Sequence, residues 1–328
     1  MRISVFVKTG VVAVALSVAP AVSTPAFAQG FPSKPIRISV PYPAGGTTDL
    51  MARALQEPLQ KSLGQPVLIE NKPGAGGLIA AREVARSAPD GHTLLFINSG
   101  IVAVAPFVVK DPGIDGIKDF SPIALVSLSP LFMVIPAALP ANDLKGFIDY
   151  LKQQPAPPDF ASAGTGSFGH LASELFARSI GVKMTHIPYK GQAPTTNAVV
   201  AGEVKMLITS ASSAMNGFIA NGKLKLLGVA SAEPTPLAPG APTIGSVVPG
   251  YAAETWFGFI AAANTPPDVV NKLNDAINRA IAPAEMQQRF AGFGVQAKTA
   301  TPKRLADMIA EDAARWSAII RDNNIRAE

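Results

Sequence analysis

The stretch from Pro43 to Asp49 combines residue types that can bind an anion, with two adjacent glycines followed by two threonines. An apolar, β-rich run over residues 36–40 precedes it, and apolar residues at helical spacing follow it. The glycines leave their backbone amides uncovered, and the first turn of a helix adds N–H donors and a partial positive charge. With the threonine hydroxyls, these donors form a seat for a small anion. The candidate ligand residues of this stretch are Ala44, Gly45, Gly46, Thr47, Thr48 and Asp49.

A purely structural interpretation of the same residues stays open at this point. Thr47 or Thr48 can cap the helix, which would make the stretch a tight turn followed by an ordinary helix start. Asp49 and Arg53 are four positions apart, which is the spacing of an ion pair along one helix face. Such a pair on an exposed helix contributes only about 0.3–0.5 kcal/mol. Composition alone does not decide between a binding loop and a capped turn.

A second glycine-rich loop, Gly164–Gly169, has the letters of the G-x-G-x-x-G pattern and lies between a predicted strand and a predicted helix. A dinucleotide site also needs an acidic residue about 20 positions further on, and residues 183–187 contain none. We therefore expect the loop to hold a smaller anion, with a structural turn as the alternative. Its candidate ligand residues are Gly164, Thr165, Gly166, Ser167 and His170, although His170 suits a helix-cap or core role better than a ligand contact.

Small polar residues recur where other predicted strands end. Asn98–Gly100, Tyr189–Gly191 and Thr209–Ser213 each follow a predicted strand. Open α/β sheets bind ligands beyond the carboxyl ends of their strands. These turns add Asn98, Ser99, Tyr189, Ser210 and Ser212 to the candidate ligand residues, and Tyr42 joins them as a ring that can stack on a ligand.

Strand and helix patterns alternate in two series, over residues 36–98 and 160–229, which is typical of parallel sheets with right-handed crossovers. The long apolar stretch Pro122–Pro136 is suited to carry the chain between the two series, and Trp256–Ala261 is suited to carry it back. We therefore expect an α/β fold of two domains, with two crossover strands and a ligand cleft between the domains. The expected boundaries are residues 29–127 with 251–328 for domain 1, and residues 128–250 for domain 2.

The N-terminal segment predicts export from the cytoplasm. Arg2 and Lys8 flank the start of a short apolar run, and Ala26-Phe27-Ala28 is a small-x-small cleavage site. We expect a signal peptide over residues 1–28 that is removed after Ala28. The apolar run is too short to span a membrane.

Composition and spacing exclude several kinds of site. The chain has no cysteine, which excludes disulfides, thiolate nucleophiles and cysteine-zinc sites. Loss of Arg2 and Lys8 with the expected signal peptide lowers the formal net charge from +5 to +3, which suits acidic small ligands, and no basic run indicates nucleic acid. His92, His170 and His186 are not spaced as a metal pair, and no pairing of a nucleophile with a base is visible. We expect no metal, no cofactor and no catalytic residue.

Five motifs, in order, resemble the signature of one known family. They are Pro43-Ala44-Gly45-Gly46-x-x-Asp49-x-x-Ala52-Arg53, Glu70–Gly77, Pro89–Leu95, His186–Pro194 and Thr255–Gly258. The chain is similar over its whole mature length to the substrate-binding proteins of tripartite tricarboxylate transporters, the Bug or TctC-like family. One departure is the segment Ser231–Thr235, which lacks the arginine that the family usually has there.

The resemblance implies a type II periplasmic binding protein fold that closes on a carboxylated ligand. It implies that the Pro43–Asp49 and Gly164–His170 loops hold a carboxylate through amides, hydroxyls and waters. It further implies a periplasmic, monomeric receptor for a small organic carboxylate, whose partners are the small and large membrane subunits of the transporter. A sensor module that presents its ligand to a signalling membrane protein would share the fold, and an exported α/β hydrolase is the enzymatic alternative.

Overall fold

The computed structural model describes residues 30–326, so the expected signal peptide over residues 1–28 lies outside the described residues. The chain from Pro32 onward forms one compact unit. In the described range no helix has the length and apolar character needed to span a lipid bilayer.

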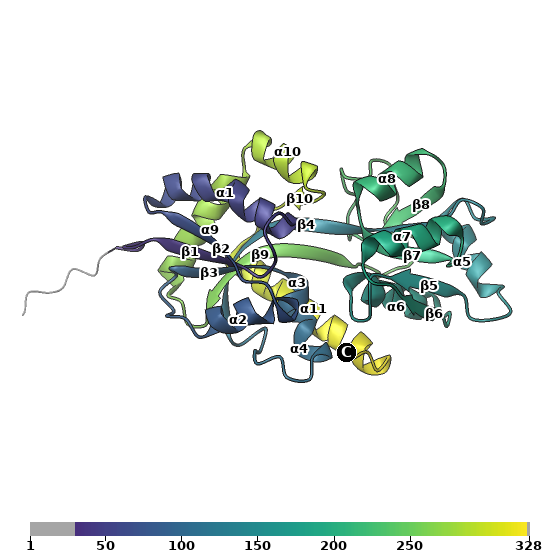
Figure 1. Cartoon of the computed structure of the whole chain (residues 1–328), viewed down its shortest axis with the longest axis horizontal. Helices are drawn as coiled ribbons and strands as arrows, with labels where there is room; N and C mark the ends of the chain where they lie inside the picture. Colours follow the sequence, from purple (N-terminus) through teal and green to yellow (C-terminus); the bar gives the residue numbers. More distant parts are fainter. Residues whose placement is uncertain (1–29, 327–328) are drawn as a thin grey trace, which may run out of the picture. The chain divides into compact units, whose positions relative to one another are not determined.

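Strands and helices alternate along most of the chain (Figure 1). The strands are β1 Ile36–Val40, β2 Val67–Asn71, β3 Thr93–Asn98, β4 Phe120–Pro136, β5 Asp159–Ser162, β6 Thr185–Pro188, β7 Met206–Ser210, β8 Leu224–Val229, β9 Glu254–Ala262 and β10 Gln296–Ala297. The α-helices are α1 Thr47–Leu63, α2 Leu78–Ala85, α3 Ser99–Ala103, α4 Ala105–Val108, α5 Leu144–Lys152, α6 Phe168–Ile180, α7 Gln192–Ala201, α8 Ser213–Ala220, α9 Pro267–Ile281, α10 Ala284–Gly292 and α11 Pro302–Asp322. Short 3-10 turns are η1 Ala75–Gly77 and η2 Ile244–Ser246.

The strands form one continuous sheet with two parallel regions. The strand order is β2-β1-β3-β9-β4-β7-β5-β6, and both β8 and β10 pair with β4. β1 pairs in parallel with β2 and β3, and β5 pairs in parallel with β6 and β7, so each β-α-β series forms its own parallel region. The predicted two-part α/β arrangement is confirmed. Strand β9, which carries the chain back to the first region, pairs antiparallel with both β3 and β4.

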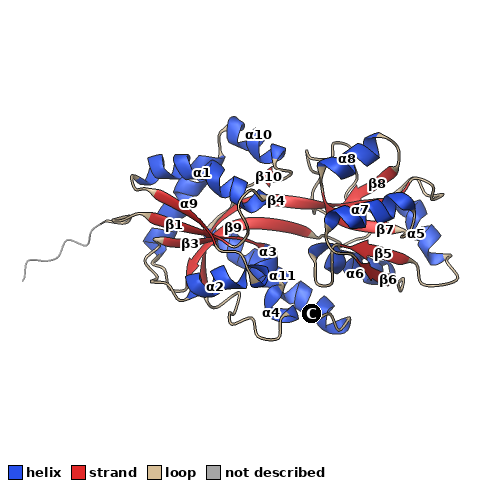
Figure 2. Ribbon diagram, in the orientation of Figure 1, coloured by secondary structure: helices blue, strands red, loops and turns tan. Residues whose placement is uncertain are grey.

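The two parallel regions are joined through β4, which changes partners along its length. From Phe120 to Pro130 it pairs with β9, and from Leu131 to Pro136 it pairs with β7 and β8. Proline has no N–H to donate to a ladder, so Pro130 suits the position where one set of partners ends. Figure 2 shows β4 and β9 running between the two groups of helices. The strand stays continuous through Pro130.

Helix α11 takes part in two hydrophobic clusters. Leu305 and Ile309, in its first half, pack with β3, α2 and the start of β4. Trp316, Ile319 and Ile320, in its second half, belong to a different cluster with residues of β4, β5 and α6. The buried face of one helix therefore contributes to the packing of both parallel regions.

The close approach of β4 and β9 yields a stability prediction. A Cβ atom at Gly258 would lie 2.7 Å from the carbonyl oxygen of Ala124, whereas a Cβ at Gly217, inside α8, would meet nothing within 4 Å. We expect Gly258→Ala to destabilise the protein by about 1–3 kcal/mol, because overpacking forces the strands apart. Gly217→Ala should be neutral or stabilise by about 0.5–1 kcal/mol, since alanine favours a helix interior. Urea unfolding of both variants measures the difference, and equal effects would contradict the packing argument.

Candidate functional site

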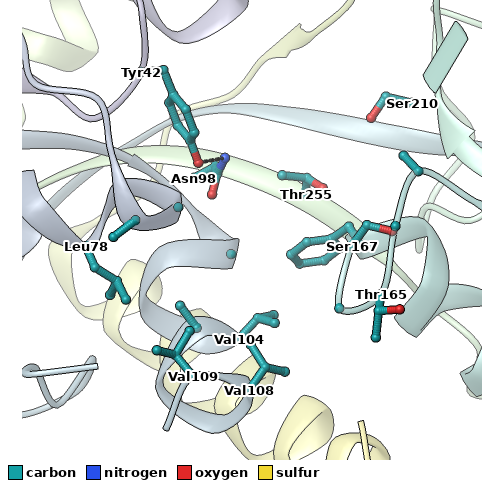
Figure 3. A pocket seen from close by; sticks show the side chains of 18 of the residues that line it. Tyr42, Leu78, Asn98, Val104, Val108, Val109, Thr165, Ser167, Ser210 and Thr255 are labelled. Atoms are coloured by element: carbon teal, nitrogen blue, oxygen red, sulfur yellow. Dashed lines mark hydrogen bonds between the residues drawn. The ribbon is translucent and has the colours of Figure 1, made fainter. Parts of the chain in front are cut away.

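A cavity of about 1040 Å³ lies where the two parallel regions face each other (Figure 3). Its wall combines the ends of β1 and β3, the α3–α4 segment, the loop before α6, and positions on β4, β7 and β9. The lining residues are Tyr42, Ala75, Gly76, Leu78, Arg82, Asn98, Gly100, Val104, Ala105, Val108, Val109, Lys110, Asp111, Ser129, Ala163, Gly164, Thr165, Gly166, Ser167, Phe168, Ser210, Thr255 and Phe257. Its size suits a small organic molecule.

Tyr42 and Asn98 form the polar wall on the side of β1 and β3. Asn98 Nδ2 donates a 2.8 Å hydrogen bond to the Tyr42 hydroxyl, and this bond is the dashed line in Figure 3. Burial raises the pKa of the Tyr42 hydroxyl, although the hydrogen bond from Asn98 opposes the rise. The hydroxyl therefore stays protonated, and because it accepts from Asn98 it can still donate its own proton to a ligand.

The loop Gly164–Ser167 forms the polar wall on the other side. Its glycines adopt positive φ, 134° at Gly164 and 77° at Gly166, which side chains rarely allow. Ser167 is the N-cap of α6, and its Oγ accepts from the backbone N–H of His170. A Cβ at Gly169 would lie 2.3 Å from the carbonyl oxygen of Ile208, so this glycine lets α6 pack directly on β7. The G-x-G-x-x-G letters thus have structural reasons that need no nucleotide.

Apolar side chains line a further part of the cavity. Leu78, Val104, Val108 and Val109 lie on α2, α3–α4 and the residues between and after them, and Phe168 faces them from the start of α6. Figure 3 shows the valines grouped away from the Tyr42–Asn98 pair. The cavity can therefore hold a ligand that is polar at one end and apolar along its body.

The two sides of the cavity come close to each other near Gly100. A Cβ at this position would lie 3.1 Å from Asn98 Oδ1 and 3.8 Å from the Phe168 ring. The Phe168 ring in turn meets Trp316 of α11 edge-on, with 5.4 Å between ring centroids. A molecule in the cavity would therefore lie one side chain away from Trp316.

The stretch from Ala44 to Asp49 does not line the cavity. Residues 44–47 are exposed, and Thr48 and Asp49 are buried. Helix α1 begins at Thr47 with Gly46 as its N-cap, and no side chain caps it, so the expected threonine cap is wrong. The uncapped first turn leaves backbone donors at the helix start.

Asp49 lies outside the cavity lining and supports it through a hydrogen-bond network. Its carboxylate accepts from Arg53 Nε, Gly45 N–H and Asn71 Nδ2, each at 2.9 Å. Asn71 Nδ2 also donates to the carbonyl oxygen of Tyr42. The predicted ion pair between Asp49 and Arg53 is present, and its network fixes the backbone of a residue that lines the cavity.

Some of the other predicted ligand residues line the cavity, and some do not. Tyr42, Asn98, Ser210 and the whole Gly164–Ser167 loop line the cavity, whereas Ser99, His170, Tyr189 and Ser212 do not. Ser99 is fully buried, and its Oγ has no hydrogen-bond partner among the described residues. Ser212 caps α8, and the Tyr189 hydroxyl donates to Glu203. His170 is buried behind Gly166 and accepts the N–H of that residue.

Several lining residues carry no signal that sequence reasoning could use. Ser129 on β4 and Thr255 on β9 lie within the crossover strands, where an isolated hydroxyl resembles any other strand position. Arg82, Lys110 and Asp111 bring charge to the lining. Arg82 is engaged with the chain itself, because its Nε and Nη2 donate to the carbonyl oxygens of Pro112 and Asp111.

The chemistry of this wall is that of binding. Hydroxyls, an amide and backbone groups dominate its polar part, and these recognise oxygen-rich anionic groups by hydrogen bonds. Among residues 30–326, no group of three or more His, Asp or Glu side chains is arranged to hold a metal ion.

Comparison with protein families and known proteins gives consistent matches. A family model described as "Tripartite tricarboxylate transporter family receptor" matches residues 51–325. A UPF0065 protein encoded between tcbD and tcbE in Pseudomonas sp. is 35% identical over 301 residues, covering 91% of this chain and 89% of that protein. BugT from Bordetella pertussis is 33% identical and covers 93% of this chain and 94% of its own length. The resemblance noted from the motifs is confirmed.

Solved structures show the same likeness. A TctC solute-binding protein from Polaromonas is 29% identical with a TM-score of 0.80, covering 89% of this chain and 99% of that chain. A Rhodopseudomonas palustris protein solved with adipate is 30% identical with a TM-score of 0.71, covering 90% and 99% of the two chains. MatC from Rhodopseudomonas palustris, solved with bound malate, is 32% identical with a TM-score of 0.67, covering 88% and 100%. The fold is thus that of periplasmic binding proteins, and these relatives are receptors, not enzymes.

The Asp49 network yields a prediction of pH-dependent stability. Burial pushes the pKa of Asp49 upward, but the hydrogen bonds from Arg53, Gly45 and Asn71 outweigh burial and hold that pKa below its ordinary value. Because the folded state binds this proton more weakly than the unfolded state, the stabilisation is complete above about pH 4 and is lost as the pH falls further. We expect Asp49→Asn to cost about 1–3 kcal/mol of unfolding free energy at pH 7, with a smaller difference at pH 3.

Asp307→Asn is the matched control, because Asp307 is a surface carboxylate paired with Lys303 four residues earlier on α11. Its replacement should change the unfolding free energy by less than about 0.5 kcal/mol. Denaturant unfolding between pH 7 and pH 3 measures both variants. An Asp49→Asn effect no larger than that of the control would refute the structural role of Asp49.

Proposed function

The chain belongs to the tripartite tricarboxylate transporter receptor family, and on that premise we propose that its cavity binds a small organic carboxylate. The observation that carries the proposal is the lining by Tyr42, Asn98 and the Gly164–Ser167 loop, which face one another from the two parallel regions. Ligand chemistry in two relatives supports it, since one was solved with adipate and the other with malate.

The donors of this wall are sufficient for useful affinity. A hydrogen bond to a charged group contributes about 1.5–3 kcal/mol, and a micromolar complex requires about 8 kcal/mol in total. Side-chain hydroxyls of Tyr42, Thr165, Ser167, Ser210 and Thr255, with the Asn98 amide, can supply several such bonds. A dedicated arginine clamp is therefore not required, and the apolar wall adds binding energy for the body of the ligand.

Receptor action also needs two movable lobes. We propose the lobes to be residues 29–127 with 251–328, and residues 128–250, closing on the ligand by bending of β4 and β9. In a closed state the backbone amides of Ala44, Gly46 and Thr47, at the uncapped start of α1, would gain access to the carboxylate, while the Gly45 amide stays bonded to Asp49. Of the predicted ligand residues outside the cavity lining, only those of this exposed stretch would join the ligand contacts in that closed state.

The proposal extends to the place and partners of the protein. We propose that the chain is exported, loses residues 1–28 and works as a monomer in the periplasm. There it delivers its carboxylate to the small and large membrane subunits of a tripartite tricarboxylate transporter. Retention of the liganded receptor by vesicles containing the two membrane subunits, and not by empty vesicles, tests this step.

Ligand charge provides the first test. Thermal unfolding should be measured with adipate, malate and aromatic acids, each beside its uncharged amide, such as adipamide for adipate. A ligand at 100 times its Kd stabilises by about 2.7 kcal/mol, which corresponds to roughly 4 °C for a chain of this size. We expect at least one acid to raise the melting temperature and its amide to have little effect. Shifts produced only by uncharged compounds would eliminate the carboxylate proposal.

Tyr42 provides the second test. Tyr42→Phe removes the hydroxyl that can donate to the ligand and leaves the ring in place, so affinity for the best acid should fall about 10-fold, or roughly 1.4 kcal/mol. Tyr150→Phe is the matched control, since Tyr150 lies on α5 outside the cavity lining. Isothermal titration calorimetry measures both variants. Unchanged affinity of Tyr42→Phe would remove Tyr42 from the proposed site.

A further inference from the structure

Two imidazole rings lie stacked directly behind the Gly164–Ser167 loop. The rings of His170 on α6 and His186 on β6 have centroids 3.7 Å apart and planes inclined by 11°. The Phe160 ring on β5 packs against both, with centroids 5.1 Å from His186 and 6.1 Å from His170. Neither histidine lines the cavity, so neither is placed to touch a ligand.

His170 is hydrogen-bonded to the loop directly, and His186 is connected to it through Ser162. His170 Nδ1 accepts the backbone N–H of Gly166 at 3.1 Å. His186 Nε2 lies 2.6 Å from Ser162 Oγ, which also donates to the carbonyl oxygen of Gly164 and accepts the N–H of Gly164. The bonded glycines are those that adopt positive φ, so the histidines act on the most unusual backbone of the loop.

The protons in this network can be assigned by counting donors. A hydroxyl has one proton, and in this arrangement Ser162 gives its proton to the Gly164 carbonyl oxygen. With the Ser162 proton so placed, His186 Nε2 is the donor to Ser162 Oγ. His170 Nδ1 accepts a hydrogen bond and therefore carries no proton. The geometry is thus complete when both rings are neutral.

We propose that His170 and His186 are positioning residues, which as a neutral stacked pair hold the Gly164–Ser167 loop in its ligand-binding conformation, and that protonation of His170 releases Gly166. The proposal rests on the function proposed for the cavity, because it concerns the shape of one wall of that site. It assigns to His170 a role in binding that requires no contact with the ligand.

The surroundings of the two rings differ. Burial and the neighbouring His170 lower the pKa of His186 to about 4, so that His186 stays neutral over the range in which histidines usually titrate. His170 has the Glu174 carboxylate of its own helix 3.6 Å from Nε2, with His186 of β6 as the other titratable group against its ring. A protonated His170 has N–H groups at both nitrogens, and Nδ1 can no longer accept from Gly166.

Two replacements of His170 separate hydrogen bonding from packing. His170→Asn places an amide oxygen near the position of Nδ1 and cannot be protonated in this pH range. His170→Phe keeps an aromatic ring against His186 and has no acceptor. His92→Asn controls for titration of a histidine that lies outside this cluster. Circular dichroism melts establish that each variant is folded.

The first measurement needs no ligand. Nuclear magnetic resonance between pH 8 and pH 5 follows the Gly166 amide shift and its hydrogen exchange, together with the imidazole nitrogen signals of the unmodified protein. We expect the Gly166 amide to be protected at pH 8 and to lose protection as His170 is protonated. Protection should persist at pH 5 in His170→Asn and should be absent at both pH values in His170→Phe. A Gly166 amide that ignores the state of His170 would overturn the proposal, even if the variants failed to fold.

The second measurement is the Kd of adipate by calorimetry at pH 7.5 and pH 5.5. Loss of one such hydrogen bond corresponds to about a fivefold weakening, expected for His170→Phe at both pH values and for the unmodified protein wherever the imidazole nitrogen signals show His170 protonated. Adipate itself titrates in this range, but His170→Asn carries the same ligand effect and should lose less affinity on acidification. His92→Asn should follow the unmodified protein. Identical pH profiles for His170→Asn and the unmodified protein would overturn the proposal.

The two measurements separate this inference from the proposed function. If adipate and the other acids bind no form of the protein while the Gly166 amide follows His170, the carboxylate proposal fails and the positioning role stands. If acids bind tightly but neither the amide nor the affinity responds to His170, the positioning role fails and the carboxylate proposal stands.

Discussion

The antiparallel pairing of β4 with β9 is the interaction on which the rest of the structure depends. These strands run side by side from Phe120 to Pro130 on β4, and β4 then pairs with β7 and β8 as far as Pro136. Every other strand is connected to β4 or β9, either by direct pairing or through neighbouring strands of the sheet. The pairing also sets where the ends of the two parallel regions face each other, and hence where the cavity lies.

The cavity wall shows how little dedicated charge a site of this kind requires. Its polar groups are mainly hydroxyls, amides and glycine-rich backbone, and two parts of it are held by hydrogen bonds from residues outside the lining. Asp49 and Asn71 fix the backbone of Tyr42, while Ser162 and the two stacked histidines fix Gly164 and Gly166. Such prior ordering lowers the entropy that a ligand must remove on binding.

Sequence patterns predicted the fold well because hydrophobic periodicity reports which faces of strands and helices are buried. They predicted the site in part. Glycines and small polar residues at strand ends located the Gly164–Ser167 loop, Asn98 and Ser210, since strand ends of parallel sheets meet at one edge. Val104 and Thr255 gave no comparable signal, because an apolar or hydroxyl residue within a strand or helix looks the same whether it faces a core or a cavity.

The treatment of Asp49 and His170 as candidate ligands shows a second limit. Polar residues beside a binding loop are equally suited to touch the ligand or to hold the loop, and the two roles differ by a few ångströms. For Asp49 the i, i+4 spacing to Arg53 correctly indicated an ion pair, but a further partner, Asn71, depends on how β1 and β2 pair. The stacking of His170 on His186 likewise requires the register of β5 against β6.

Helix α11 packs in two hydrophobic clusters, and this affects the order of folding. Trp316, Ile319 and Ile320 complete a hydrophobic cluster whose other members lie mostly between residues 103 and 253. During synthesis the chain emerges from its amino end, so this cluster stays incomplete until α11 has emerged. Contacts so distant in sequence form slowly. Delayed completion of this kind keeps a chain in a loosely folded state for longer.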